Sequence, residues 1–362
     1  MAYHLQIIPW TLHFKQPAGT SRGIYSIRRV WYLILNDTAR LDVVGWGECA
    51  PLPALSAEYD CKYESRLTAV CRRFEAEGAL DREALRPWSS VLFGLETALR
   101  QLEASREGRF TLWDTPFSRG EAGIPINGLI WMGDYRKMRE QIEQKIEAGF
   151  RCIKLKIGAI DFEQELALIR HIRSCFTARE IELRVDANGA FTAAEALDKL
   201  KRLAELDLHS IEQPIRAGQW QEMARLAQES PLPIALDEEL IGVYRPDEKR
   251  RLLETIRPQY IILKPSLHGS FYGCAEWIAL ADEMLEKGKW WITSALESNI
   301  GLNAIAQWCA TFRNPLPQGL GTGLLYTDNV SMPLSIRKDC LWYDARAAFP
   351  SVEKTIVSGA QK

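Results

Sequence analysis

Six polar residues recur at intervals of 25 to 30 residues between positions 156 and 294: Lys156, Asp186, Glu212, Asp237, Lys264 and Ser294. Each follows a short apolar stretch typical of a buried β-strand. Three carboxylates cannot all be ionised in one dry site without a counter-charge, because like charges raise one another's pKa. A divalent cation would supply that charge, and oxygen ligands without His or Cys favour a hard ion such as Mg²⁺.

The lysines add a second kind of chemistry to this pattern. In RCIKLKIGAI (151–160), Lys154 and Lys156 alternate with apolar residues, so a strand would place both on one face. Nearby ammonium groups, a metal ion and partial burial all lower the pKa of a lysine, so one of them could act as a base near neutral pH. A metal that holds a substrate carboxylate stabilises the enediolate formed when the α-proton leaves. A simpler alternative is that the lysines only form ion pairs with Asp186 or Glu212. That alternative does not explain all six of the recurring polar residues.

Strands and helices must bring these six residues together if they are to form one site. From about residue 125 strand and helix alternate, with helices over 136–148 and 162–173 and a capping box formed by Thr192 and Glu195. Eight such units close into a (β/α)₈ barrel, whose active site lies at the carboxyl ends of the strands. The predicted strands are 152–157, 181–186, 209–214, 233–239, 260–266, 290–298 and a last short one near 319–323.

The first part of the chain has a different pattern. Residues 1–60 predict a strand, a turn and a strand, with 30–35 the clearest strand, and 61–74 and 91–102 have helical spacing. Strands followed by helices describe an α+β unit. We therefore predict an α+β capping domain over 1–122, a barrel domain over 123–329, and a segment 330–362 that packs back on the first domain.

The composition excludes several classes of protein. The 362 residues are 47% hydrophobic and carry a formal net charge of −2. Such a charge does not produce a positive electrostatic field that would attract nucleic acid or an anionic membrane. The start, MAYHLQIIPW, does not read as a signal peptide, and no segment has the roughly 20 apolar residues that span a bilayer. Eight cysteines occur without a Cys-x-x-Cys pair, which favours reduced thiols. We predict a cytoplasmic protein that acts on a small molecule, and homo-oligomerisation stays open.

Five motifs occur in a fixed order: the Lys-x-Lys of IKLKIG, the Asp of RVDANGA, the Glu of IEQP, the Asp of LDEE and the Lys of ILKPS. With these motifs the chain resembles the enolase superfamily, specifically its muconate-lactonizing-enzyme subgroup. TSRG (20–23) and GWGECAPLP (45–53) resemble the two loops that close over the substrate in that subgroup. The resemblance implies an enolase-like modified TIM barrel with an N-terminal capping domain. It also implies that Asp186, Glu212 and Asp237 bind Mg²⁺, with Mn²⁺ as a substitute.

Within the subgroup, SALESNIGLNAIAQW (294–308) followed by GLGTG (319–323) is most similar to o-succinylbenzoate synthases. These hydro-lyases dehydrate 2-succinyl-6-hydroxy-2,4-cyclohexadiene-1-carboxylate to o-succinylbenzoate in menaquinone biosynthesis. Dipeptide epimerases of the subgroup carry an Asp-x-Asp pair where this chain has Gly321-Thr322-Gly323. A site without that pair does not favour a cationic amine, whereas glycine amides can hold a carboxylate. As a bare motif, GLGTG is equally compatible with a plain tight turn.

The resemblance also implies a role for each residue. Lys156 would remove the α-proton and then protonate the departing β-hydroxyl on the same face. Lys264 would stabilise the enediolate, and Lys154 would help to hold the substrate carboxylate. Glu239 stands where the family often has Ser, which leaves the role of that position open. The remaining candidates are Ser294, Gly321, Thr322 and Arg22 for substrate binding, and Asn188 and Glu238 as supports of the metal ligands.

Other functions fit part of this pattern. An N-acylamino acid racemase, a dipeptide epimerase and a muconate cycloisomerase all begin with an enolate, so the metal ligands and lysines alone do not choose among them. Racemisation would use Lys156 and Lys264 on opposite faces of the substrate. A catalytically silent binding protein on the same barrel would lack a ligand or a base, and this chain lacks none.

Overall fold

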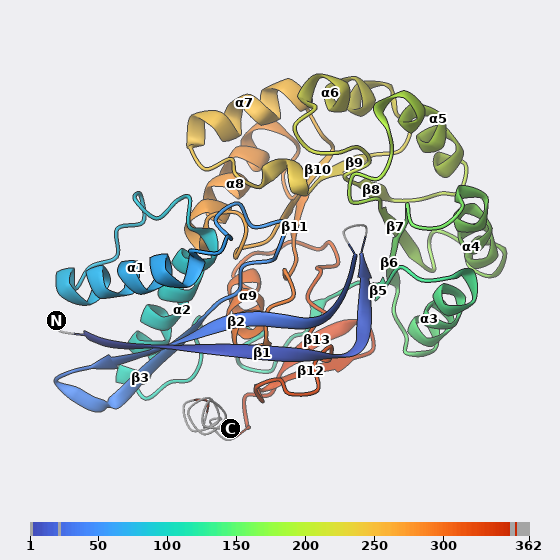
Figure 1. Cartoon of the computed structure of the whole chain (residues 1–362). Coiled ribbons are helices and arrows are strands. Elements are labelled where there is room, and N and C mark those ends of the chain that lie inside the picture. Colours follow the sequence, from blue (N-terminus) through green and yellow to red (C-terminus); the bar gives the residue numbers. More distant parts are fainter. Residues whose placement is uncertain (1–2, 21–22, 348–351, 353–362) are drawn as a thin grey trace.

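The N-terminal part of the protein is an antiparallel sheet covered by two helices. The computed structural model describes residues 3–20, 23–347 and 352 (Figure 1). β2 lies in the middle of its sheet, and alternate residues such as Trp31 and Leu33 face the two helices. The sequence predicted two strands here, and the structure has three. The elements are β1 (Tyr3–Thr20), β2 (Gly23–Asp37), β3 (Arg40–Cys49), α1 (Tyr63–Glu77) and α2 (Ser89–Arg106).

A curled sheet of seven parallel strands follows, in the spatial order β11-β10-β9-β8-β7-β6-β5. Helices α3 to α8 surround it as an outer arc in Figure 1. The strands are β5 (Gly128–Ile130), β6 (Cys152–Lys156), β7 (Glu182–Asp186), β8 (Ser210–Glu212), β9 (Ile234–Leu236), β10 (Tyr260–Leu263) and β11 (Trp290–Ile292). The helices are α3 (Tyr135–Glu147), α4 (Phe162–Cys175), α5 (Ala193–Ala204), α6 (Trp220–Glu229), α7 (Pro246–Ile256), α8 (Ser270–Met284) and α9 (Asn299–Cys309), with a 3₁₀ turn η1 (Glu238–Leu240).

The ring closes through two residues rather than a full eighth strand. Gln318 bridges to Ile126 before β5, and Gly319 bridges to Thr293 after β11, both in parallel orientation. The Gly319 amide donates to the Ile292 carbonyl at 2.8 Å. The prolines and glycines of the PLPQGLGTG stretch (315–323) explain why no longer strand forms, because proline lacks a donor and glycine weakens a strand. The predicted (β/α)₈-type barrel is confirmed, with its last strand reduced to a bridge.

The alternation inside β6 positions the two lysines. Ile153 and Leu155 belong to the apolar core beneath the helices, whereas Lys154 and Lys156 face the barrel interior. Lys156 lies opposite Asp186 in the next strand, and Asp186 lies opposite Glu212 in the one after. The predicted register of polar groups is therefore confirmed for these three strands.

Several predicted strands extend too far at their carboxyl ends. The strand predicted over 290–298 ends at Ile292, because Leu296 adopts a left-handed conformation (φ 64°) and Ser298 caps α9. Asp237 and Lys264 likewise come directly after β9 and β10. The chain turns toward the next helix at these points, and this turn places the polar side chains at the rim.

The last described segment pairs with the start of the barrel region. β13 (Cys340–Tyr343) lies between β12 (Leu334–Arg337) and β4 (Ile124–Pro125) in an antiparallel sheet. Tyr343 also contacts Phe117, with ring centroids 5.9 Å apart. The predicted division at 122/123 stays a prediction, and residues 348–351 and 353–362 of the predicted C-terminal segment lie outside the described residues. None of the described helices has the length and apolar character needed to cross a membrane.

The predicted capping box at the start of α5 is present and gives a stability test. The Thr192 hydroxyl accepts from the Glu195 amide, and the Glu195 carboxylate accepts from the Thr192 amide at 3.1 Å. We expect Thr192→Ala to lower the free energy of unfolding by about 1 kcal/mol, measured by urea denaturation, because an orphan amide loses its acceptor. Thr68→Ala, at a partly exposed position of α1, is the control and should cost nothing, since Ala is the better helix former. Equal losses in both variants would contradict the cap.

Candidate active site

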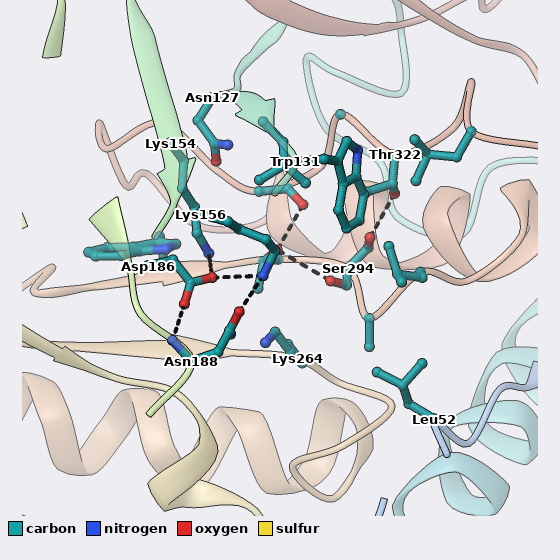
Figure 2. A pocket seen from close by; sticks show the side chains of 18 of the residues that line it. Leu52, Asn127, Trp131, Lys154, Lys156, Asp186, Asn188, Lys264, Ser294 and Thr322 are labelled. Atoms are coloured by element: carbon teal, nitrogen blue, oxygen red, sulfur yellow. Dashed lines mark hydrogen bonds and ion pairs between the residues drawn. The ribbon is translucent and has the colours of Figure 1, made fainter. Parts of the chain in front are cut away.

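A pocket opens at the carboxyl ends of the barrel strands (Figure 2). It measures about 1100 Å³, part of it open to solvent. One wall comes from the N-terminal region, with Tyr25 on β2 and Leu52 and Leu55 in the loop after β3. The other lining residues include nine predicted site residues: Lys154, Lys156, Asp186, Asn188, Glu238, Lys264, Ser294, Gly321 and Thr322.

The lysines and carboxylates of the site form close ion pairs. The Lys154 ammonium lies 3.0 Å from Asp186 Oδ2 and also pairs with Glu212. Lys156 Nζ lies 3.1 Å from the same oxygen of Asp186. On the opposite side of the pocket, the Lys264 ammonium pairs with Asp237. The structure thus gathers the predicted lysines and acids in one place, as ion pairs.

These pairs shift the pKa of Lys154 and of Lys264. Burial lowers the pKa of Lys154, but the charges of Asp186 and Glu212 outweigh it, so that the pKa lies above its ordinary value. For Lys264, burial likewise lowers the pKa, and Asp237 raises it further than burial lowers it. The sequence led us to expect depressed lysine pKa values. The difference arises because carboxylates face the ammonium groups of Lys154 and Lys264.

Asp186 and Glu212 differ in how many lysines lie beside them. Burial raises the pKa of Glu212 well above its ordinary value, and the adjacent Asp186 charge raises it further. For Asp186, burial acts in the same direction, but Lys154 and Lys156 bring its pKa below the ordinary range. The difference follows from the geometry, because Lys154 and Lys156 both face Asp186, whereas Glu212 pairs with Lys154.

The donor set of this cluster fits a hard cation. Glu212 Oε1 and Asp237 Oδ1 are buried carboxylate oxygens without a hydrogen-bond partner. Unpaired buried oxygens are costly, and carboxylate oxygens are the ligands that Mg²⁺ prefers. Within the described part of the chain, no three His, Cys, Asp or Glu side chains are already arranged around a common point as a metal site. The residue types therefore fit Mg²⁺, while their arrangement is that of ion pairs.

Asn188 connects Lys156 to the acids. Its side-chain oxygen accepts from Lys156 Nζ at 2.7 Å, and its side-chain nitrogen donates to Glu238 at 3.1 Å. Its own amide donates to Asp186 Oδ1 at 3.0 Å. Asn188 has φ 45°, a conformation that Asn tolerates better than most residues. The two predicted supports thus touch each other, and Asn188 touches Lys156 and Asp186.

The predicted substrate-binding residues lie together on the far wall. The hydroxyls of Ser294 and Thr322 are 2.7 Å apart, and both residues line the pocket with Gly321. A Cβ at Gly319 would lie 2.2 Å from Thr293 Oγ1, so packing demands glycine there, whereas a Cβ at Gly321 would meet only ordinary contacts of 3.5 Å. Gly321 has no left-handed backbone, but the chain turns over 321–324, where the Leu325 amide donates to the Thr322 carbonyl at 3.2 Å, so the tight-turn explanation also fits this stretch. Arg22 lies outside the described residues.

Sequence reasoning left the role of Glu239 open and missed Gln213. Glu239 joins two rim loops: its carboxylate accepts from the Gly218 amide at 2.7 Å and from Gln213 Nε2 at 3.1 Å. Gln213 in turn accepts from the Asp237 amide at 3.2 Å, which orients that acid. The adjacency of Gln213 to Glu212 in IEQP was the available signal. The apolar wall residues Trp131, Leu296 and Leu325 gave no sequence signal of their own.

Comparison with known sequences and structures identifies the family of this chain. A profile described as enolase C-terminal domain-like matches residues 137–342, and the chain belongs to that family. An o-succinylbenzoate synthase of Desulfotalea psychrophila is 46% identical over 360 residues, covering 90% of this chain and 95% of that relative. The crystal structure of MenC from the same organism superimposes with a TM-score of 0.81 at 41% identity, covering 94% of this chain and all of that chain, 100%.

A second solved structure carries a metal. It is an o-succinylbenzoate synthase of Thermosynechococcus elongatus complexed with Mg in the active site, with a TM-score of 0.70 and 25% identity. The match covers 88% of this chain and 92% of that one. The predicted membership of the enolase superfamily is confirmed by these comparisons.

Proposed function

We infer that the chain is an o-succinylbenzoate synthase, a hydro-lyase that converts 2-succinyl-6-hydroxy-2,4-cyclohexadiene-1-carboxylate to o-succinylbenzoate. The observation that carries this inference is the pair of lysines, Lys156 and Lys264, facing one pocket across a cluster of buried acids. The 46% identity to the Desulfotalea enzyme over nearly the whole chain confirms the enzyme class that the sequence predicted.

The proposed mechanism assigns proton transfer to Lys156. As a free amine, Lys156 takes the α-proton from the ring carbon that bears the carboxylate, and the electron pair moves into an enediolate. The resulting ammonium then gives its proton to the β-hydroxyl, the carbon–oxygen bond breaks, and water leaves as the ring becomes aromatic. Asn188, within 2.7 Å of the Lys156 ammonium, keeps this group aimed into the pocket.

The other charged residues stabilise the intermediate. The Lys264 ammonium, which is mostly buried, places a positive charge on the opposite side of the pocket. Lys154 lies beside both Asp186 and Glu212 and adds a second fixed positive charge. We propose that Asp186, Glu212 and Asp237 hold Mg²⁺, which when bound would neutralise these acids and act as a Lewis acid toward the substrate carboxylate.

The pocket wall that carries Ser294, Gly321 and Thr322 suits the succinyl end of the substrate. The hydroxyls of Ser294 and Thr322 and the backbone around Gly321 offer hydrogen bonds to a carboxylate at the tip of a short chain. Leu52, Leu296 and other apolar residues enclose the space between this end and the acids. We propose that the succinyl arm lies along this wall. Use of Mn²⁺, a cytoplasmic location, a role in menaquinone synthesis and the absence of nucleic-acid and membrane partners stay predictions.

The direct test is turnover of the cyclohexadiene substrate by the purified protein with Mg²⁺, followed as loss of diene absorbance. We expect turnover within the ordinary range of about 1–10³ s⁻¹, loss of activity with EDTA and recovery with added Mg²⁺. A folded protein with no turnover at saturating Mg²⁺ would exclude the proposed reaction.

A racemase is the second candidate, because Lys156 and Lys264 approach the pocket from opposite sides (Figure 2). Incubation of an N-succinylamino acid with the protein in D₂O separates the two functions. Fast α-deuterium exchange with racemisation, together with slow dehydration, would favour the racemase. We expect dehydration to be the faster reaction, since the site lacks the acid pair of the epimerases.

A further inference from the structure

Arg28, on β2 of the N-terminal sheet, is buried between that sheet and the barrel, with only 2% of its surface exposed. Its guanidinium donates to the carbonyls of Ala50 (2.6 Å) and Pro51 on one side. On the other side it donates to the carbonyls of Ala295 and Leu296, both at 3.3 Å. One cation therefore links the loop after β3 to the loop after β11.

Glu48, on β3, holds the same barrel segment a few residues further on. Its carboxylate accepts from the Ser298 amide (2.8 Å), the Ser298 hydroxyl (2.6 Å) and the Gly301 amide (2.8 Å). These donors belong to the first turn of α9, where helix amides lack internal partners and favour a negative charge. A Cβ at Gly301 would lie 2.9 Å from Glu48 Oε2, so the helix and the carboxylate are in close contact.

The segment between these two anchors is a wall of the pocket. Ser294, Ala295 and Leu296 all line it. Leu296 has φ 64°, which is unfavourable for a residue with a branched side chain, and its carbonyl also accepts from the Tyr326 hydroxyl at 2.7 Å. Strained backbone of this kind persists only where surrounding contacts determine it. Two of these contacts come from Arg28 on the N-terminal sheet, which holds the carbonyls of Ala295 and Leu296, and Tyr326 supplies another.

We propose that Arg28 and Glu48 together form an interdomain clamp that positions the 294–296 wall for substrate binding. Arg28 holds carbonyls of both pocket loops, and Glu48 fixes the amides where α9 begins. Neither residue contacts the lysines or the acids, so both are positioning residues. The clamp deepens the proposed function, because it determines where the succinyl arm meets the protein.

The test compares Arg28→Met with the matched control Arg29→Met. Met keeps much of the volume of the Arg stem but donates no hydrogen bonds, and Arg29 is a half-exposed neighbour that pairs with Glu64. We expect Arg28→Met to raise KM for the cyclohexadiene substrate about tenfold, with kcat changing less than about threefold, since wall geometry changes and the catalytic groups do not. Arg28→Lys, which keeps the charge with fewer donors, should fall in between. Arg29→Met should match the wild type.

A second variant distinguishes a local effect on the pocket wall from a general loss of folded protein. Glu48→Gln keeps the shape but offers a single acceptor oxygen to three donors, and Asp42→Asn on the exposed part of β3 is its control. We expect Glu48→Gln to raise KM and to speed hydrogen exchange at the Ser298 and Gly301 amides, with no effect in the control. A purely structural role would reduce the folded fraction, and with it the apparent Vmax, without changing KM.

Two outcomes would overturn the clamp: an unchanged KM in both variants, or unchanged exchange at the Ser298 and Gly301 amides in Glu48→Gln. Inactivity of the wild-type protein would instead exclude the proposed function. In that case hydrogen exchange alone decides, because faster exchange in Glu48→Gln supports the clamp and equal exchange refutes it.

Discussion

Lys156→Ala is expected to lower kcat for dehydration by at least about 10³-fold, because one side chain supplies both the base and the acid of the proposed mechanism. The fold should survive, since Asp186 keeps its 3.0 Å contact with Lys154 after Lys156 is removed. Stopped-flow measurement of the loss of diene absorbance gives kcat, and calorimetric Mg²⁺ titration should give the wild-type affinity.

Lys137→Ala is the matched control, since Lys137 is exposed on α3 and far from the acids in the barrel. It should leave kcat and Mg²⁺ affinity unchanged. Near-normal turnover in Lys156→Ala would remove Lys156 from its proposed role. Loss of turnover together with loss of Mg²⁺ binding would show that the substitution disturbs the acids instead.

Glu212→Gln is expected to weaken Mg²⁺ binding by at least about 100-fold, because it removes a charged ligand. This substitution suits the site, since Gln keeps the size and shape of Glu212 and removes only its charge. The Glu212 oxygen without a partner, Oε1, has no hydrogen bond to lose. Turnover should fall in parallel and recover in part at high Mg²⁺ concentration.

The comparison variant is Glu222→Gln, an exposed acid in the first turn of α6. Calorimetry of both variants with Mg²⁺ alone separates metal binding from catalysis. Wild-type affinity in Glu212→Gln would show that Glu212 is not a ligand, whatever happens to turnover.

Local patterns allowed much of the barrel to be predicted from the sequence. The alternation around Lys154 and Lys156 reports which face of β6 is interior, and the regular interval between polar residues reports the length of each β/α unit. Both depend on neighbours along the chain, which sequence periodicity captures.

Other features depend on contacts between distant segments, and the sequence did not reveal them. The positive φ of Leu296 depends on donors from Arg28 and Tyr326, which are far from it in the sequence. The pairing of Asp237 with Lys264 depends on which groups share a dry space and not on spacing alone. The role of Glu239 required the position of the Gly218 loop.

The two-residue bridge at Gln318 and Gly319 has a consequence for motion in the barrel. Between β11 and β5 the ring is joined by a few backbone hydrogen bonds, whereas β6 and β7 pair over five residues each. Local opening requires least free energy where the fewest bonds must break. We therefore expect the ring to open more readily beside Gly321 and Thr322 than between β6 and β7, which carry Lys156 and Asp186.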